Sequence, residues 1–357
     1  MPRPVWKEIH DHPDLRGIAA GRRGRARLNR SVKPVPDQLK HQAGAALLAA
    51  MLTVTLVATL AASALWQQWR DVEIEASERS RVQAGWMLSG ALDWSRLILR
   101  EDLRATTASG GTQIDSLNEP WAVPLQEARL SSFLAADRNN TDDAGADDLF
   151  LSGTIVDAQG LFNLRNLVTG DSTVDPAALQ ILVRLCAGLD VAEHEARLIA
   201  RGMVAAQLGD ADNATLMPLR LDEIAWFGVS PGTIRRLAPY ATFLPERSTV
   251  NLNTASAPVL AAVLDISNSV ARKMTVARTD NPFRALSDAQ RAAGVPLVLD
   301  DSLHSVASGF FLVRGRLRLA QAAVEEISLL KRDRISVRIV WRERGAVVLP
   351  AATAVPP

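Results

Sequence analysis

The chain has 357 residues, 48% of them apolar, which is enough for two or three domains with cores of their own. Its single cysteine, Cys186, excludes an internal disulfide. The formal net charge of +1 conceals a basic stretch, because the first forty residues hold ten Lys or Arg residues against four acidic ones.

An uncharged apolar run of about 22 residues, from Ala45 to Trp66, follows the basic stretch and is long enough to cross a bilayer as one helix. A secretory signal peptide has a shorter apolar core of about 7–15 residues that ends at a cleavage site. This run continues without a break into a helical pattern, so we expect it to stay in the inner membrane as a single pass. The basic residues favour a cytoplasmic N-terminus and a periplasmic remainder, although a basic arm can also bind nucleic acid.

Residues 67–110 continue the helix as an amphipathic extension that should pack on a globular domain. Leucines recur on one face at helical spacing, and Ser109, Gly110 and Gly111 end the pattern; the leucines are Leu88, Leu92, Leu99 and Leu103. After a polar connection, residues 149–167 are typical of a β-hairpin around the turn Asp157–Gly160, where Gly160 would adopt a positive φ.

From residue 176 to 294 the chain shows short helical patterns, with Ser230–Pro231 and Ala257–Pro258 typical of helix starts. Residues 295–349 return to strands in which apolar residues alternate with Arg, typical of antiparallel strands with one solvated face. Strands on both sides of the helical stretch most simply share one sheet. We therefore predict an α+β fold, with a discontinuous domain over 111–175 and 295–349, an inserted all-helical domain over 176–294, and a disordered tail over 350–357.

An acidic stretch carries the candidate metal ligands Asp137, Asn139, Asp142 and Asp143. Oxygens alternate at every second position from Asp137, which suits calcium. The glycine and the late glutamate of a full calcium loop are missing, so a solvated loop is the alternative and no other cofactor is expected.

Residues 250–278 resemble the helix-hairpin-helix of DNA-binding proteins. The hairpin Asp265–Asn268 contains no glycine, and the Asp265 carboxylate would repel phosphate. The structural alternative is that Asn251, Asn253 and Thr254 order the turn into the following helix. We expect no nucleic-acid partner.

Catalytic motifs are missing from the sequence. His194 and His304 are isolated, and no nucleophile elbow, phosphate loop or zinc-protease spacing accompanies them. We therefore do not expect an enzyme.

Five stretches, in order along the chain, resemble minor pseudopilin K of the type II secretion system: residues 44–66 with the charged helix that follows, 118–125 (NEPWAVPL), 153–167, 237–264 and 308–321. The resemblance implies a pilin-like fold, in which a long N-terminal helix packs on an antiparallel sheet, with a large inserted all-helical domain. It also implies that prepilin peptidase cleaves the chain between Gly44 and Ala45 and that the new N-terminus is methylated. The mature protein would join two other minor pseudopilins and cap the tip of the periplasmic pseudopilus.

The fifth residue after Gly44 is Ala49, where major pilins carry Glu. A charge in hydrocarbon is costly unless it is paired, so alanine fits a terminal subunit that pairs with nothing beyond it. Equally, alanine is an ordinary residue of a membrane helix. The alternative function is a single-pass, membrane-anchored periplasmic protein that binds or takes up DNA.

Overall fold

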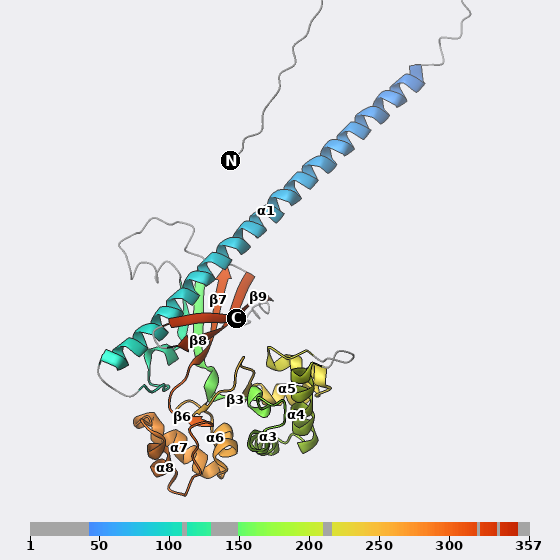
Figure 1. Ribbon diagram of the computed structural model, residues 1–357. Coiled ribbons are helices and arrows are strands. Elements are labelled where there is room, and N and C mark those ends of the chain that lie inside the picture. The colour runs from blue at the N-terminus through green and yellow to red at the C-terminus, as the bar shows by residue number, and fades with distance from the viewer. Residues whose placement is uncertain are drawn as a thin grey trace, which may run out of the picture. The chain divides into compact units, whose positions relative to one another are not determined.

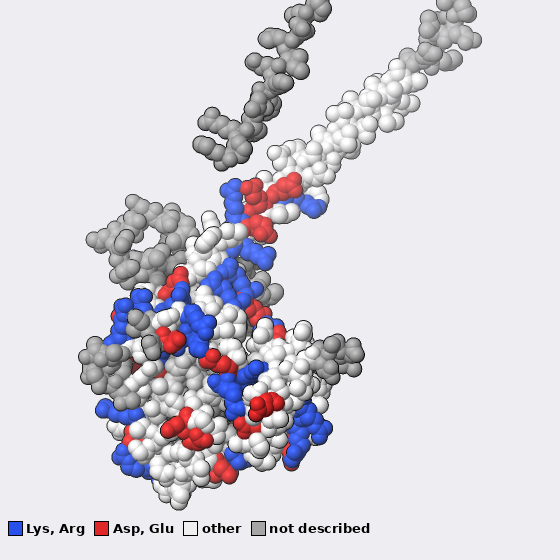
Figure 2. Space-filling view, viewed as in Figure 1, with Lys and Arg blue, Asp and Glu red and all other residues white. Residues whose placement is uncertain are grey.

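The computed structural model describes residues 43–108, 113–129, 149–209, 216–319, 322–333 and 336–348, which belong to two compact units, residues 1–72 and 73–357. Helix α1 (Ala43–Ala108) confirms the predicted continuous helix. Its N-terminal part carries no Lys, Arg, Asp or Glu before Arg70 and meets the length and hydropathy expected of a membrane span (Figure 2). The hydroxyls of Thr53, Thr55, Thr59 and Ser63 each donate to a carbonyl one turn earlier, so the helix satisfies them internally, as a bilayer requires.

Five antiparallel strands form the main sheet in the order β1-β2-β7-β8-β9, and the C-terminal half of α1 lies along this sheet (Figure 1). The strands are β1 (Leu125–Arg129), β2 (Leu149–Asp157), β7 (Phe310–Leu319), β8 (Ala322–Asp333) and β9 (Ser336–Val348). The predicted antiparallel pairing of the last three strands is confirmed, whereas the face predicted to be solvated is covered in part by the chain segment between β2 and β7. The mixture of a long helix and an antiparallel sheet confirms the α+β fold class.

The four leucines predicted to share a face of α1 are all buried, and three of them pack against the sheet. Leu92 and Leu99 pack in one cluster with Trp121, Phe311 and Leu330. Leu88 packs in a second cluster with Leu149 and Leu151 of β2 and Leu317 of β7. Burial of a leucine contributes about 2 kcal/mol relative to its exposure. The helical spacing in the sequence therefore placed the sheet-facing side of α1 correctly.

The predicted hairpin over residues 149–167 is wrong. β2 pairs with β7, and after it the chain turns through the 3-10 helix η3 (Ala158–Gly160), where the Asp157 carboxylate accepts a hydrogen bond from the Gln159 N–H. β3 (Phe162–Asn163) then pairs in parallel with β4 (Ala241–Thr242). Gly160 has no positive φ; it is required because a Cβ there would lie 2.8 Å from Thr254 Oγ1.

Between β2 and β7 the chain forms a helical block, which we define as residues 162–306 because its hydrophobic core runs from Phe162 to Val306. This core extends beyond the predicted range of 176–294 on both sides. Its helices are α3 (Pro176–Gly188), α4 (Glu193–Leu208), α5 (Pro231–Leu237), α6 (Ala257–Leu264), α7 (Asn268–Asp280) and α8 (Leu286–Ala293), with 3-10 helices η4 (Leu164–Leu167) and η5 (Leu221–Phe227). A small parallel pair, β5 (Val250–Asn251) and β6 (His304–Ser305), closes the block.

The predicted helix starts at the two Xaa-Pro pairs are confirmed. Ser230 caps α5 by accepting a hydrogen bond from the Thr233 N–H, and Pro231 is the first residue of that helix. Ala257–Pro258 begin α6 after Ser256. Proline suits the first turn because its missing N–H has no partner within the helix.

The helical block contacts the face of the sheet that points away from α1. Leu244 packs with Phe310 and Leu329, and the Lys331 ammonium pairs with Glu246. Arg220 Nη1, just before η5, lies 2.5 Å from Glu343 Oε2 on β9. The sheet is thus covered by α1 on one face and by part of the helical block on the other.

Candidate functional site: a carboxylate junction

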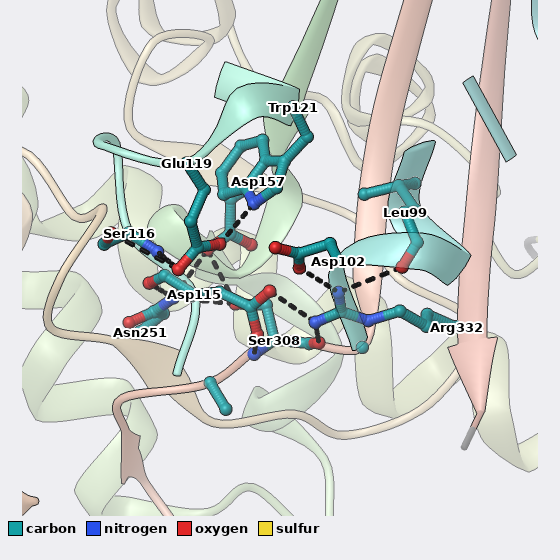
Figure 3. Close-up of polar contacts among 12 residues, drawn as sticks. Leu99, Asp102, Asp115, Ser116, Glu119, Trp121, Asp157, Asn251, Ser308 and Arg332 are labelled. Atoms are coloured by element: carbon teal, nitrogen blue, oxygen red, sulfur yellow. Dashed lines mark hydrogen bonds and ion pairs between the residues drawn. The ribbon is translucent and has the colours of Figure 1, made fainter. Parts of the chain in front are cut away.

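Where α1, the sheet and the helical block meet, the fold collects four acidic side chains and one arginine (Figure 3). We call this set the carboxylate junction: Asp102, Asp115, Glu119, Asp157 and Arg332. α1 provides Asp102, the segment after α1 provides Asp115 and Glu119, the end of β2 provides Asp157, and β8 provides Arg332.

Arg332 lies at the centre of the junction, with 1% of its side chain exposed. Its Nη1 donates to Asp102 Oδ2 at 3.1 Å, and its Nη2 donates to Asp115 Oδ1 and, at 3.0 Å, to the Ser308 carbonyl. The guanidinium also stacks over the Phe311 ring, 4.7 Å from its centroid. One arginine therefore ties the end of α1 to the sheet and to the start of β7.

Glu119 is held at the edge of the junction by two donors. Its Oε1 accepts from the Ser116 N–H at 3.2 Å, and its Oε2 accepts from Trp121 Nε1 at 2.5 Å. Burial raises the pKa of Glu119 to about 7, and the nearby Asp102 and Asp115 carboxylates raise it too, against the Trp121 hydrogen bond, which lowers it.

Asp157 connects the junction to the helical block. Its Oδ2 accepts hydrogen bonds from Ser308 Oγ at 2.6 Å, Thr254 Oγ1 at 2.6 Å and Asn251 Nδ2 at 2.9 Å. Complete burial raises the pKa of Asp157 in spite of these donors. Asn251 Nδ2 also donates to the Asp115 carbonyl at 2.9 Å, so Asn251 links Asp157 to the segment that carries Asp115.

The junction can hold protons, and it suits a bound cation poorly. Oxygens of Asp102, Asp115 and Glu119 lie within 4.8 Å of one another, a spacing that hard cations accept. Arg332 already donates to two of these three carboxylates, however, and a cation would meet its positive charge. One guanidinium against four carboxylates leaves excess negative charge in a buried place, which protonation of Glu119 and Asp157 relieves.

A second candidate site is the side of α1 turned away from the buried leucines. Large apolar side chains recur there at helical spacing and form what we call the outer stripe: Val82, Trp86, Trp94 and Leu97. Trp86 is 75% exposed. Exposed tryptophan on a helix whose opposite face is already buried is typical of a surface that binds another protein.

Some sequence-predicted sites lie in or near α1. Gly44 and Ala45 lie in the first turn of the described helix and Ala49 lies further along, all of them in its apolar part. Among the described residues, a Cβ at Gly44 would meet no atom within 4 Å. The candidate calcium ligands Asp137, Asn139, Asp142 and Asp143 lie outside the described residues, so that site stays a prediction.

The resemblance to a helix-hairpin-helix corresponds to α6 and α7. Asp265 ends α6 in the left-handed conformation (φ 53°), and its carboxylate lies 3.6 Å from Arg184 Nη1. Asn251 and Asn253 do order the preceding turn, since Asn251 Oδ1 accepts from the Asn253 N–H at 2.9 Å and Asn253 Oδ1 accepts from the Phe283 N–H at 2.8 Å. The hairpin presents a carboxylate where phosphate binding needs free N–H groups.

Sequence reasoning missed the carboxylate junction. Its members are spread from residue 102 to 332, and no spacing links them. One signal was available: Glu119 and Trp121, which bond to each other, both belong to the stretch NEPWAVPL.

Comparison with known proteins confirms the resemblance seen in the sequence. Residues 160–246 and 250–307 match two family models, both described as type II secretion system protein K. The chain is 26% identical over 333 residues to the type II secretion system protein K of Pseudomonas aeruginosa, covering 87% of this chain and 95% of that protein. It is 25% identical over 339 residues to the protein of the same name from Pectobacterium carotovorum, covering 85% and 97%.

A similar solved structure is a chain from the GspK–GspI–GspJ complex of the enterotoxigenic Escherichia coli type 2 secretion system, with a TM-score of 0.54 and 20% identity. The match covers 75% of this chain and 98% of that chain, and it supports the fold. Two family models that match consecutive parts of the helical block, and relatives that align over most of their length, make this chain similar to type II secretion system protein K.

Proposed function

We propose that this protein is a membrane-anchored minor pseudopilin that assembles with other minor pseudopilins and caps the periplasmic pseudopilus. One observation carries the proposal: α1 is a single helix with two different parts. Its first part is uncharged and apolar, and its second part buries leucines on one side and exposes the outer stripe on the other. Such a helix can anchor in a membrane and still offer a surface to neighbouring helices. Its role is structural, without catalysis.

The apolar part of α1 would be the single membrane pass, with the basic residues 1–44 in the cytoplasm and the sheet and helical block in the periplasm. Prepilin peptidase would cleave after Gly44, and Ala45 would become the methylated N-terminus. Co-expression with the peptidase, followed by mass spectrometry, tests this. We expect wild type to begin at N-methylated Ala45 and Gly44→Val to keep its leader.

The Gly44→Val variant is a clean control because a Cβ at Gly44 would meet no atom within 4 Å. Its helix should therefore fold as in wild type, which circular dichroism can verify. A wild-type chain that keeps its leader whenever the peptidase is present would overturn the processing proposal.

The outer stripe would bind the helices of partner minor pseudopilins. The similar solved chain comes from a complex of three such proteins, which supports the choice of partner. Trp86→Asp should reduce the amount of partner that copurifies with the full chain by about tenfold or more, because buried tryptophans dominate interface energies. Trp226→Asp is the matched control, since Trp226 is also exposed but lies in the helical block.

The terminal position is supported by two features. The helical block adds a large body to the pilin-like sheet, and Ala49 brings no charge into the membrane where growing pilins carry Glu. Electron microscopy of pseudopili with a label on the helical block should find one label at one end. Labels along the whole filament would contradict the proposal.

A further inference from the structure

A hollow of about 260 Å³ lies between α1 and the sheet, beside the edge strand β1. Its walls are mainly apolar and include Leu88, Leu92, Ile98, Trp121 and Val313. An apolar cavity of about 150 Å³ is large enough to admit benzene. This hollow therefore has room for one aromatic side chain.

Two residues without side chains, Gly153 and Gly315, line the hollow. Gly153 on β2 and Gly315 on β7 are direct cross-strand partners, and both line the hollow on the face covered by α1. The neighbouring row on that face holds Ile155 and Val313 and is filled. Leu88 Cδ2 lies 3.4 Å from where a Cβ at Gly315 would stand, so Leu88 takes part of the space that the glycines leave, and the hollow is the remainder.

One buried oxygen atom on a residue that lines the hollow, Ser328 Oγ, has no hydrogen-bond partner among the described residues. Ser328 is only 1% exposed. The neighbouring Glu326 is paired with Arg342 and Arg344, with Arg342 Nε 3.1 Å from Oε1. The Ser328 hydroxyl therefore lacks a partner, and a buried polar group left unpaired costs about 1–3 kcal/mol.

The rim of the hollow is apolar and continues into the outer stripe. Trp94 belongs to both, and Val123 and Leu125 line the opposite side with 70% and 38% of their surfaces exposed. A helix that binds along the outer stripe would thus pass beside the rim. The same protein shows the expected chemistry, since the Trp121 indole packs on Phe311 and donates to the Glu119 carboxylate.

We propose that this hollow receives a tryptophan or tyrosine side chain from a partner minor pseudopilin, whose N–H or O–H donates to Ser328 Oγ. The inference rests on the proposed function, because it names the anchor by which such a partner is held. A large aromatic ring matches the apolar walls, and its one polar group matches the unpaired Ser328 hydroxyl. The hollow would then be the centre of the interface and the outer stripe its flank.

The test fills the hollow in the full chain. Ser328→Leu puts an apolar side chain into the space and removes one acceptor. We expect it to reduce copurification of the partner by about tenfold or more, as for loss of a central anchor, while the melting temperature of the free protein stays the same or rises. Ser287→Leu, on an exposed serine of α8 in the helical block, is the matched control and should change neither.

Each outcome decides the matter. A folded Ser328→Leu protein that still copurifies its partner as wild type does would overturn the proposal and leave a hollow filled by solvent. If Ser328→Leu melts early, Ser328→Ala replaces it: this variant adds no volume, and it should melt no lower than wild type and retain several-fold less partner. Wild type that captures no partner would refute the proposed function itself, which separates the two failures.

Discussion

Glu119 should make the protein less stable as pH rises from about 4.5 to about 7. The pKa of this carboxyl is about 7 in the folded protein, against an ordinary value of 4.5 for glutamate. Between these values the unfolded chain has lost the proton that the folded chain keeps, so the free energy of unfolding falls with rising pH. A difference of about 2.5 pKa units corresponds to roughly 3 kcal/mol at about 1.36 kcal/mol per unit.

The assay is thermal unfolding of the full chain in lipid nanodiscs, followed by circular dichroism at about pH 4.5 and about pH 7.5. A change of roughly 3 kcal/mol in a protein of this size corresponds to a fall of roughly 6 °C in the melting temperature. Glu119→Gln is the matched variant, because glutamine resembles the protonated acid and can still accept the Trp121 hydrogen bond.

The glutamine variant should lose most of this pH dependence and melt higher than wild type at about pH 7.5. Asp102 and Asp157, whose pKa values burial also raises, act in the same direction and account for what remains. If the variant shows the same slope as wild type, the proton is not held at Glu119 and the reasoning about the carboxylate junction fails.

Three further predictions follow, two from the structure and one from the sequence. Arg332→Met should lower the free energy of unfolding in urea by about 3–5 kcal/mol, since it leaves buried carboxylates unpaired; a loss below about 1 kcal/mol would contradict the central role of this arginine. Gly160→Ala should cost about 1–3 kcal/mol through its clash with the helical block, whereas Gly90→Ala, which meets no neighbour within 4 Å, should cost nothing. Calcium titrated calorimetrically into the full chain should release or absorb heat that Asp137→Ala abolishes; wild type without heat at millimolar calcium would remove that site.

Local periodicity made much of the fold predictable. The leucines of α1 recur at spacings of four and seven residues because one side of a helix is buried, and the strands β7 to β9 alternate because one side of each faces a core. Proline after serine or alanine marked the starts of α5 and α6 for a similar reason, since the first turn of a helix tolerates proline.

The features that the sequence did not predict depend on contacts between residues far apart in the chain. Strand alternation identifies β2 as a strand but cannot identify its partner, and the nearby residues 162–167 look equally suitable. Those residues instead bury Phe162, Leu164 and Leu167 in the core of the helical block. The carboxylate junction was hidden for the same reason, because Asp102 and Arg332 become neighbours only when α1 lies on β8.

The placement of the helical block between paired strands constrains the order in which the protein can fold. β2 and β7 pair from Leu149–Leu319 to Asp157–Phe311, yet roughly 150 residues separate them in the chain. Closing a flexible loop of that length costs about 4 kcal/mol in chain entropy. If the helical block forms first, its own pair β5–β6 and the bonds from Asn251 bring Asp157 and Ser308 together beforehand. The sheet would then close as if β2 and β7 were joined by a tight turn, and a defect in the block's core would delay the sheet that lies outside it.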